Sequence, residues 1–161
     1  MAFSKTVVLK EILAKLTAEV ALYARAARAA HAEATDEQSR AENKYDTRGL
    51  EASYLARGQS RQAAEVEQAL AQFQALSTRD FPPETPVGVG TLVELVSGRE
   101  HQWYFIGPRA GGLEVTCDKI EVTVLTPHSP LGGELMGRKQ GDRVRLDLGG
   151  AKRELRLTHV S

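Results

Sequence analysis

The first part of the chain carries apolar residues at alternating spacings of three and four. The series follows Ser4, which can cap a helix starting at Lys5. Such a heptad seam is typical of a long helix packed lengthwise against one partner. Because the seam ends in alanines, the two helices should approach most closely there. The seam consists of Thr6, Leu9, Leu13, Leu16, Val20, Tyr23, Ala27 and Ala30.

A second helical pattern runs from about Ser39 to Leu76. Gly49 and Gly58 lie within it, and each costs about 1 kcal/mol relative to alanine in a helix interior. We therefore expect pairing with the first helix to stabilise this segment. Its apolar positions include Tyr45, Ala52, Leu55, Val66, Ala69, Phe73 and Leu76. The two patterns together predict an antiparallel helical hairpin, a coiled coil, over residues 1–76.

The stretch between the two patterns, residues 33–46, is polar and is predicted to form the tip of the hairpin. Five acidic residues and two basic ones leave it with an excess of negative charge. These are Glu33, Asp36, Glu37, Glu42 and Asp46 against Arg40 and Lys44. Ser39 and Glu42 also have the spacing of a capping box, in which each side chain bonds the backbone N–H of the other residue. Glu42 can therefore serve as a helix cap or as a metal ligand.

The composition changes at residues 77–86, where three prolines fall within five residues. Proline cannot continue a helix, so this segment is predicted to be a linker. Beyond it, β-branched residues predict strands at 91–97, 102–106, 120–125, 143–148 and 154–159, with a short further strand at 113–115. Ser129 as N-cap and Pro130 at the first position predict one short helix. The expected fold class is α+β, with a small, mostly antiparallel sheet over residues 87–161.

Composition excludes several classes of function. The net charge of the 161 residues is zero, which gives no electrostatic reason to expect binding to nucleic acid or to a membrane. The single cysteine, Cys117, excludes a disulfide framework, and the four histidines lack ligand spacing. We expect no metal in the free protein and no tightly bound cofactor. No apolar run reaches about 18 residues, so a cytoplasmic location is expected. Ser129 follows His128 directly, but adjacency in sequence does not make a catalytic dyad.

One segment carries a more specific pattern. It reads Ser129-Pro-Leu-Gly132, then Leu135-Met-Gly-Arg-Lys139, then Gly141-Asp-Arg-Val144. This succession of a Ser-Pro cap, a short helix and a Gly-Asp turn resembles the C-terminal domain of the bacterial Gre-type transcription elongation factors. Glu42-Asn43 followed by Tyr45 is similar to the tip of that family's coiled coil. The resemblance extends over essentially the whole chain.

The resemblance implies an FKBP-like C-terminal domain that binds RNA polymerase. The implied partner-binding residues are Ser129, Pro130, Leu131, Gly132, Gly137 and Asp142. It further implies that the coiled coil enters the secondary channel of the polymerase. There the tip acids Asp36, Glu37 and Glu42 would help to hold a Mg²⁺ ion of the polymerase during transcript cleavage. Mg²⁺ is bound in such sites by one or two carboxylates together with water and phosphate oxygens.

The tip departs from the family pattern at one position, because Ser39 stands where cleaving members have an acidic residue. Cleavage support and a non-cleaving role, as in the regulator of nucleoside diphosphate kinase, therefore both stay open. Two further alternatives belong to other classes. An FKBP-like body could be a peptidyl-prolyl isomerase, although only Trp103, Tyr104 and Phe105 offer aromatic pocket walls. A structural coiled-coil dimer is the other alternative, whereas the intramolecular hairpin predicts a monomer.

Overall fold

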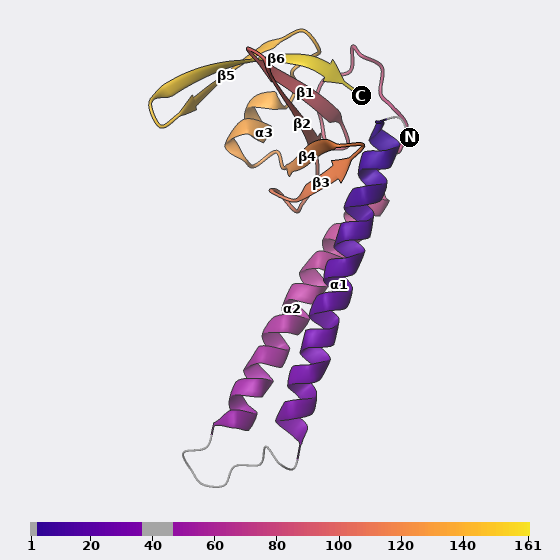
Figure 1. Cartoon of the computed structure of the whole chain (residues 1–161), viewed down its shortest axis with the longest axis vertical. Helices are drawn as coiled ribbons and strands as arrows, with labels where there is room; N and C mark the ends of the chain where they lie inside the picture. The colour runs from indigo at the N-terminus through magenta and orange to yellow at the C-terminus, as the bar shows by residue number, and fades with distance from the viewer. Residues whose placement is uncertain (1–2, 37–46) are drawn as a thin grey trace. The chain divides into compact units, whose positions relative to one another are not determined.

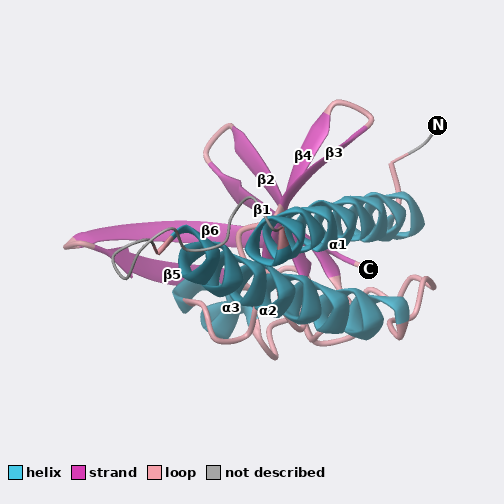
Figure 2. Cartoon of the chain, turned by 90° about the horizontal axis from the view of Figure 1, so that it is seen from below, coloured by secondary structure: helices cyan, strands magenta, loops and turns pink. Residues whose placement is uncertain are grey.

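The computed structural model describes residues 3–36 and 47–161. Helix α1 spans Lys5–Thr35 and helix α2 spans Arg48–Gln74, and the two lie side by side (Figures 1 and 2). Ser4 caps α1 as predicted, since its Oγ accepts the Val7 N–H at 3.3 Å and its carbonyl accepts the Val8 N–H at 3.0 Å. The predicted helix start at Ser39 and the capping box with Glu42 lie outside the described residues.

The chain divides into two compact units, which we describe separately. One consists of Met1–Ala14 and Ala71–Ser161, and the other of Lys15–Leu70. The first unit therefore contains the sheet together with both ends of the predicted hairpin. The domain boundaries expected from the sequence, 1–76, 77–86 and 87–161, remain a prediction.

In the second unit, a stripe of small residues lies at the interface of the two helices. Ala27, Ala30, Ala52 and Ala56 are all buried, as expected for helices that approach closely. The predicted seam residue Leu55 is instead 54 % exposed. Four residues turn a helix by about 400° and three by about 300°, so position 56 points closer to the direction of Ala52 than position 55 does. Ala56 therefore takes the place in the seam that the spacing assigned to Leu55.

The first turns of α1, in the first unit, also differ from the predicted seam. Thr6 is exposed and Leu13 is half-buried, whereas Val8 and Ile12 are fully buried. Lys5 is fully buried as well. Lys5, Leu9, Ile12 and Leu16 follow one another at spacings of four, three and four. The buried stripe therefore begins one residue earlier than predicted, at Lys5 in place of Thr6, and passes through Ile12 in place of Leu13.

Six strands form one sheet in the order β3-β4-β2-β1-β6-β5. Their bounds are β1 Leu92–Ser97, β2 Glu100–Ile106, β3 Glu114–Cys117, β4 Ile120–Leu125, β5 Arg143–Leu148 and β6 Ala151–Val160, with α3 at Pro130–Leu135 (Figure 1). All neighbours pair antiparallel except β2 and β4, which are parallel. This confirms the predicted α+β class, a helical pair followed by a mostly antiparallel sheet with one short helix.

The two faces of the sheet bury different partners. On one face, apolar side chains of β1, β2, β5 and β6 pack with Leu135 of α3. They are Val93, Leu95, Ile106, Val144, Leu155, Leu157 and Val160. On the other face, Phe105 lies 6.1 Å from the Phe73 ring of α2, and Trp103 lies 4.7 Å from the Phe3 ring. Gly107 leaves room for Phe73, because a Cβ there would come within 2.6 Å of the ring.

Candidate functional site

The segment that carries the sequence motif folds around the cap of α3. Ser129 Oγ accepts the Gly132 N–H at 3.0 Å and donates to the Thr126 carbonyl at 2.8 Å. The same hydroxyl thus satisfies an unpaired N–H at the helix start and fastens the preceding turn. A hydroxyl held in this way is a structural cap, and nothing in its contacts makes it a nucleophile beside His128.

Only glycine fits at position 132, because the surrounding atoms leave no room for a Cβ. A Cβ at this position would collide with the Thr126 carbonyl oxygen and lie 2.7 Å from Ser129 Oγ. The neighbouring Gly133 is far less constrained, because its Cβ would meet only the Pro127 carbonyl oxygen, at 3.3 Å. The first glycine of the motif is therefore an element of the fold of this turn.

The turn after α3 uses two further motif positions. Gly137 has φ +80°, a left-handed conformation that ends the helix without a Cβ penalty. Its N–H donates to the Val87 carbonyl at 2.9 Å, and the Val87 N–H donates to the Arg138 carbonyl at 2.7 Å. Asp142 then accepts the Lys139 N–H at 2.9 Å and directs the chain into β5. Gly137 and Asp142 thus fix the backbone from α3 to the next strand.

Other side chains of this segment project outward. Pro130 is exposed, Leu131 is half-buried, and Met136 is 37 % exposed. Arg138 and Lys139 are also exposed. The six residues implied as partner contacts therefore separate by position: Ser129, Gly132, Gly137 and Asp142 build the turn, whereas Pro130 and Leu131 reach its surface.

The acidic end of the hairpin is described only in part. Asp36 directly follows α1 and is exposed, while Glu37 and Glu42 lie outside the described residues. Within residues 3–36 and 47–161, no group of three or more His, Cys, Asp or Glu side chains could hold a metal ion. The donor set implied for a shared Mg²⁺ is therefore an expectation that rests on residues beyond the described ranges.

Sequence reasoning missed a buried amine in the first turn of α1. Lys5 is 0 % exposed, and its Nζ lies 3.8 Å from the centroid of the Phe81 ring. Within the described chain this Nζ has no hydrogen-bond partner. Burial lowers the pKa of Lys5, and the nearby Asp80 carboxylate opposes that shift. The signal was available, since Lys5 precedes Leu9 by four residues and so occupies a seam position.

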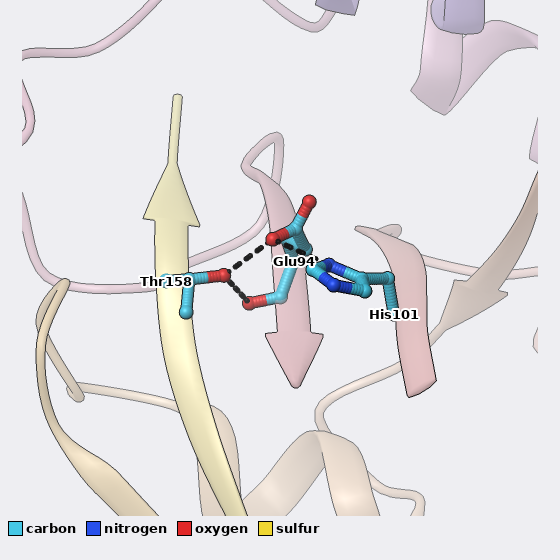
Figure 3. Close-up of polar contacts among 3 residues, drawn as sticks. All are labelled: Glu94, His101 and Thr158. Atoms are coloured by element: carbon cyan, nitrogen blue, oxygen red, sulfur yellow. Dashed lines mark hydrogen bonds and ion pairs between the residues drawn. The ribbon is translucent and has the colours of Figure 1, made fainter. Parts of the chain in front are cut away.

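A Thr–Glu–His cluster spans β6, β1 and β2 (Figure 3). Thr158 Oγ1 donates to Glu94 Oε1 at 2.6 Å, and His101 Nδ1 lies 3.3 Å from the same oxygen. Thr158 falls where the register between β1 and β6 shifts, so its hydroxyl helps to hold this irregularity. Both partners bind the carboxylate, and no contact joins the hydroxyl to the imidazole. The cluster therefore lacks the nucleophile–base pair that hydrolysis requires.

The aromatic residues considered for an isomerase pocket are already engaged. Phe105 is fully buried beside Phe73. Trp103 makes an edge-to-face contact with Phe3 and a tilted contact with His159, with ring centroids 4.7 and 5.3 Å away. The Tyr104 side chain joins the core on the α3 face, and its hydroxyl donates to Gln102 at 2.9 Å. These contacts leave the three rings without a shared open pocket, which argues against the isomerase alternative.

No helix among the described residues is long and apolar enough to cross a membrane. No protein-family profile matches the chain, and no curated protein matches it. Among solved structures, it is similar to GreA factor homolog 1 (Gfh1) of Thermus thermophilus, with 20 % identity over 92 % of this chain and 94 % of that one, and a TM-score of 0.39. Thermus aquaticus Gfh1 is 21 % identical over 98 % and 96 %, with a TM-score of 0.40. A GreA/GreB elongation factor from Nitrosomonas europaea is 20 % identical over 62 % and 78 %, with a TM-score of 0.36.

Proposed function

We propose that this chain is an RNA polymerase-binding regulator of transcript elongation. The observation that carries the proposal is the segment from β4 through α3 to β5. Its Ser129 cap, its crowded Gly132 and its Asp142 turn are the features on which the resemblance to Gre-type factors rests. The proposed partner is the one that this resemblance implies.

The exposed side chains of this segment suit a protein partner. Met136 offers a flexible apolar surface, and Arg138 and Lys139 add positive charge beside it. Methionine and arginine are both enriched at the centres of protein interfaces. We infer that Pro130, Met136 and Arg138 contact the polymerase, while the motif glycines hold these side chains in place.

The hairpin is proposed to enter the secondary channel of the polymerase. The resemblance supplies this role, and the exposed Asp36 next to the end of α1 agrees with an acidic tip. When Asp36, Glu37 and Glu42 reach the active centre, they supply carboxylate oxygens of the type that Mg²⁺ accepts. Ser39, in place of an acid, favours a regulator that occupies the channel without stimulating cleavage.

Binding is tested with the full-length chain, because the compact unit that holds the sheet also contains Met1–Ala14 and the end of α2. A fragment that began after residue 86 would lack Phe73 and so expose Phe105. The test variant is Met136→Glu, and the control is Ala151→Glu at the exposed first residue of β6. Pull-down with core RNA polymerase should weaken at least about tenfold for Met136→Glu, as for the loss of a central contact, and stay unchanged for the control.

Absence of any polymerase binding by the wild-type chain would overturn the proposal. A dimer in sedimentation, together with absence of binding, would favour the structural coiled-coil alternative. If Ala151→Glu weakened binding as much as Met136→Glu, the assigned contact surface would be wrong.

Cleavage is tested separately in stalled, backtracked complexes. The wild type should bind without accelerating cleavage, and Ser39→Asp should add cleavage, because Asp restores the acidic position and is as good an N-cap as Ser. Strong cleavage by the wild type, lost in Asp36→Asn with Glu37→Gln, would instead assign metal delivery to those two acids. Cleavage in neither protein would mean that the tip does not act at the active centre.

A further inference from the structure

A groove of about 890 Å³ lies between α1 and α2 in the unit Lys15–Leu70. We call it the arginine groove, after the cationic side chains that line it. Arg28 and His31 come from α1, and Arg57 and Arg61 come from α2. Its volume falls within the range of about 300–1,000 Å³ that is typical of small-molecule sites.

Small residues explain why the groove is open. Ala27 and Ala56 line it, and both side chains are buried in the seam between the helices. Because an alanine side chain is a single carbon, it cannot fill the space that longer residues would occupy. Thr35, Ser53 and Ser60 also line the groove. The Thr35 hydroxyl already donates to the His31 carbonyl at 3.0 Å, so Ser53 and Ser60 are the hydroxyl residues that can donate to a ligand.

The arginine groove is positively charged, although the chain as a whole is neutral. The whole chain has a net charge of zero, yet three arginines line this one groove and no carboxylate does so among the described residues. All three arginines are exposed. Positive side chains that line one groove without a carboxylate favour the binding of an anion.

The positions of the arginines on the two helices indicate the class of anion. Arg57 and Arg61 are one turn apart on the same face of α2, and Arg28 lines the groove from α1. The Arg57 guanidinium carbon also lies 5.9 Å from the centroid of the Tyr54 ring. Guanidinium groups bind phosphate oxygens through paired N–H donors. Donors on both walls suit a ligand with several phosphate oxygens along its length more than a single small ion.

We propose that the arginine groove binds a ligand carrying two or more linked phosphates, such as a nucleoside di- or triphosphate. The phosphates lie between Arg28 and the Arg57–Arg61 pair, and the hydroxyl and alanine side chains leave room for the rest of the ligand. This site goes beyond the proposed polymerase binding and does not depend on it, because it belongs to the free chain.

Calorimetric titration of the full-length protein with ATP, pyrophosphate, AMP and adenosine tests the proposal at constant ionic strength. ATP and pyrophosphate should bind at one site per chain, AMP at least about tenfold more weakly, and adenosine without measurable heat. Arg28→Gln and Arg61→Gln should each weaken ATP binding at least about tenfold, the loss expected for one charge-assisted hydrogen bond. Arg25→Gln is the matched control, since Arg25 is exposed on α1 outside the groove. Circular dichroism of each variant should show unchanged helix content.

A single-stranded RNA oligonucleotide separates the two sources of phosphate. Competition by RNA that is no stronger than by ATP supports the proposed site. RNA binding at least about tenfold tighter than ATP, lost in the same variants, would overturn the small-ligand assignment in favour of a strand-binding surface. Equal binding of AMP and ATP, no binding of either, or equal loss in Arg25→Gln would each overturn the proposal.

Discussion

The two adjacent glycines of α3 should respond to alanine with different outcomes. At Gly132, a Cβ collides with the Thr126 carbonyl oxygen and presses on Ser129 Oγ at 2.7 Å. Overpacking of this kind costs about 1–3 kcal/mol, and displacement of the Ser129 cap costs a further 0.5–2 kcal/mol or so. Gly132→Ala should therefore lower the free energy of unfolding of the sheet-containing unit by about 1.5–5 kcal/mol.

Gly133→Ala is the matched control for this perturbation. Its Cβ would meet only the Pro127 carbonyl oxygen, at 3.3 Å, and the residue is exposed. The better helix propensity of alanine, about 1 kcal/mol, should offset that tight contact and leave the net change within about 1 kcal/mol of zero. Both variants add the same methyl group, so a difference in their stability reports the difference in space around positions 132 and 133.

Urea unfolding followed by the fluorescence of Trp103, the single tryptophan of the chain, is the suitable assay. Trp103 lies in β2, within the sheet-containing unit, so the signal reports on the unit that holds α3. Equal destabilisation by the two substitutions, or a change below about 0.5 kcal/mol for Gly132→Ala, would refute the reasoning from the contacts.

Two further predictions concern α1 and the seam. Leu16→Ala removes a buried side chain and should lower the free energy of unfolding by about 2–5 kcal/mol in thermal or urea unfolding. Leu55→Ala changes an exposed side chain and should alter it by no more than about 0.5 kcal/mol. Similar losses in the two variants would mean that Leu55 is buried between the helices. Burial lowers the pKa of Lys5 in the folded chain below its usual 10.5. Between these two pKa values the unfolded chain binds a proton at Lys5 that the folded chain has released. The free energy of unfolding should therefore rise with pH in this window. Lys5→Met should lose this rise relative to wild type in urea unfolding at matched pH values, and parallel pH profiles would contradict it.

The sequence predicted the elements of this fold better than their packing. Local signals located the Ser4 cap, the Pro130 helix start and most strand positions, because capping and turn chemistry act over a few residues. The pairing of β2 with β4 in parallel could not be predicted, since it joins residues far apart in the chain. Seam assignment failed at Leu55 because spacings of three and four are both compatible with a heptad pattern, and the structure selects between them.

The candidate sites were predictable to different degrees. The motif around Ser129 was found from local spacing, and its backbone role follows from contacts within the same turn. The arginine groove was missed because Arg28 and Arg57 lie on different helices, and only the pairing of α1 with α2 brings them together. The signal that could have found it is the one-turn spacing of Arg57 and Arg61, next to Ala56.

The residues that carry the resemblance are those that the backbone needs. Ser129 caps, Gly132 has no room for a side chain, and Gly137 adopts φ +80°. Such a motif specifies how the turn folds, whereas a partner can only contact what projects from it, here Met136 and its exposed neighbours. Folding and polymerase binding should therefore separate. Met136→Glu should weaken binding while Trp103 fluorescence shows an unchanged unfolding free energy, whereas Gly132→Ala should lower the unfolding free energy and weaken binding as well. Binding losses that simply followed stability in both variants would mean that the projecting side chains make no contact, and that the resemblance describes the fold of this segment rather than its partner.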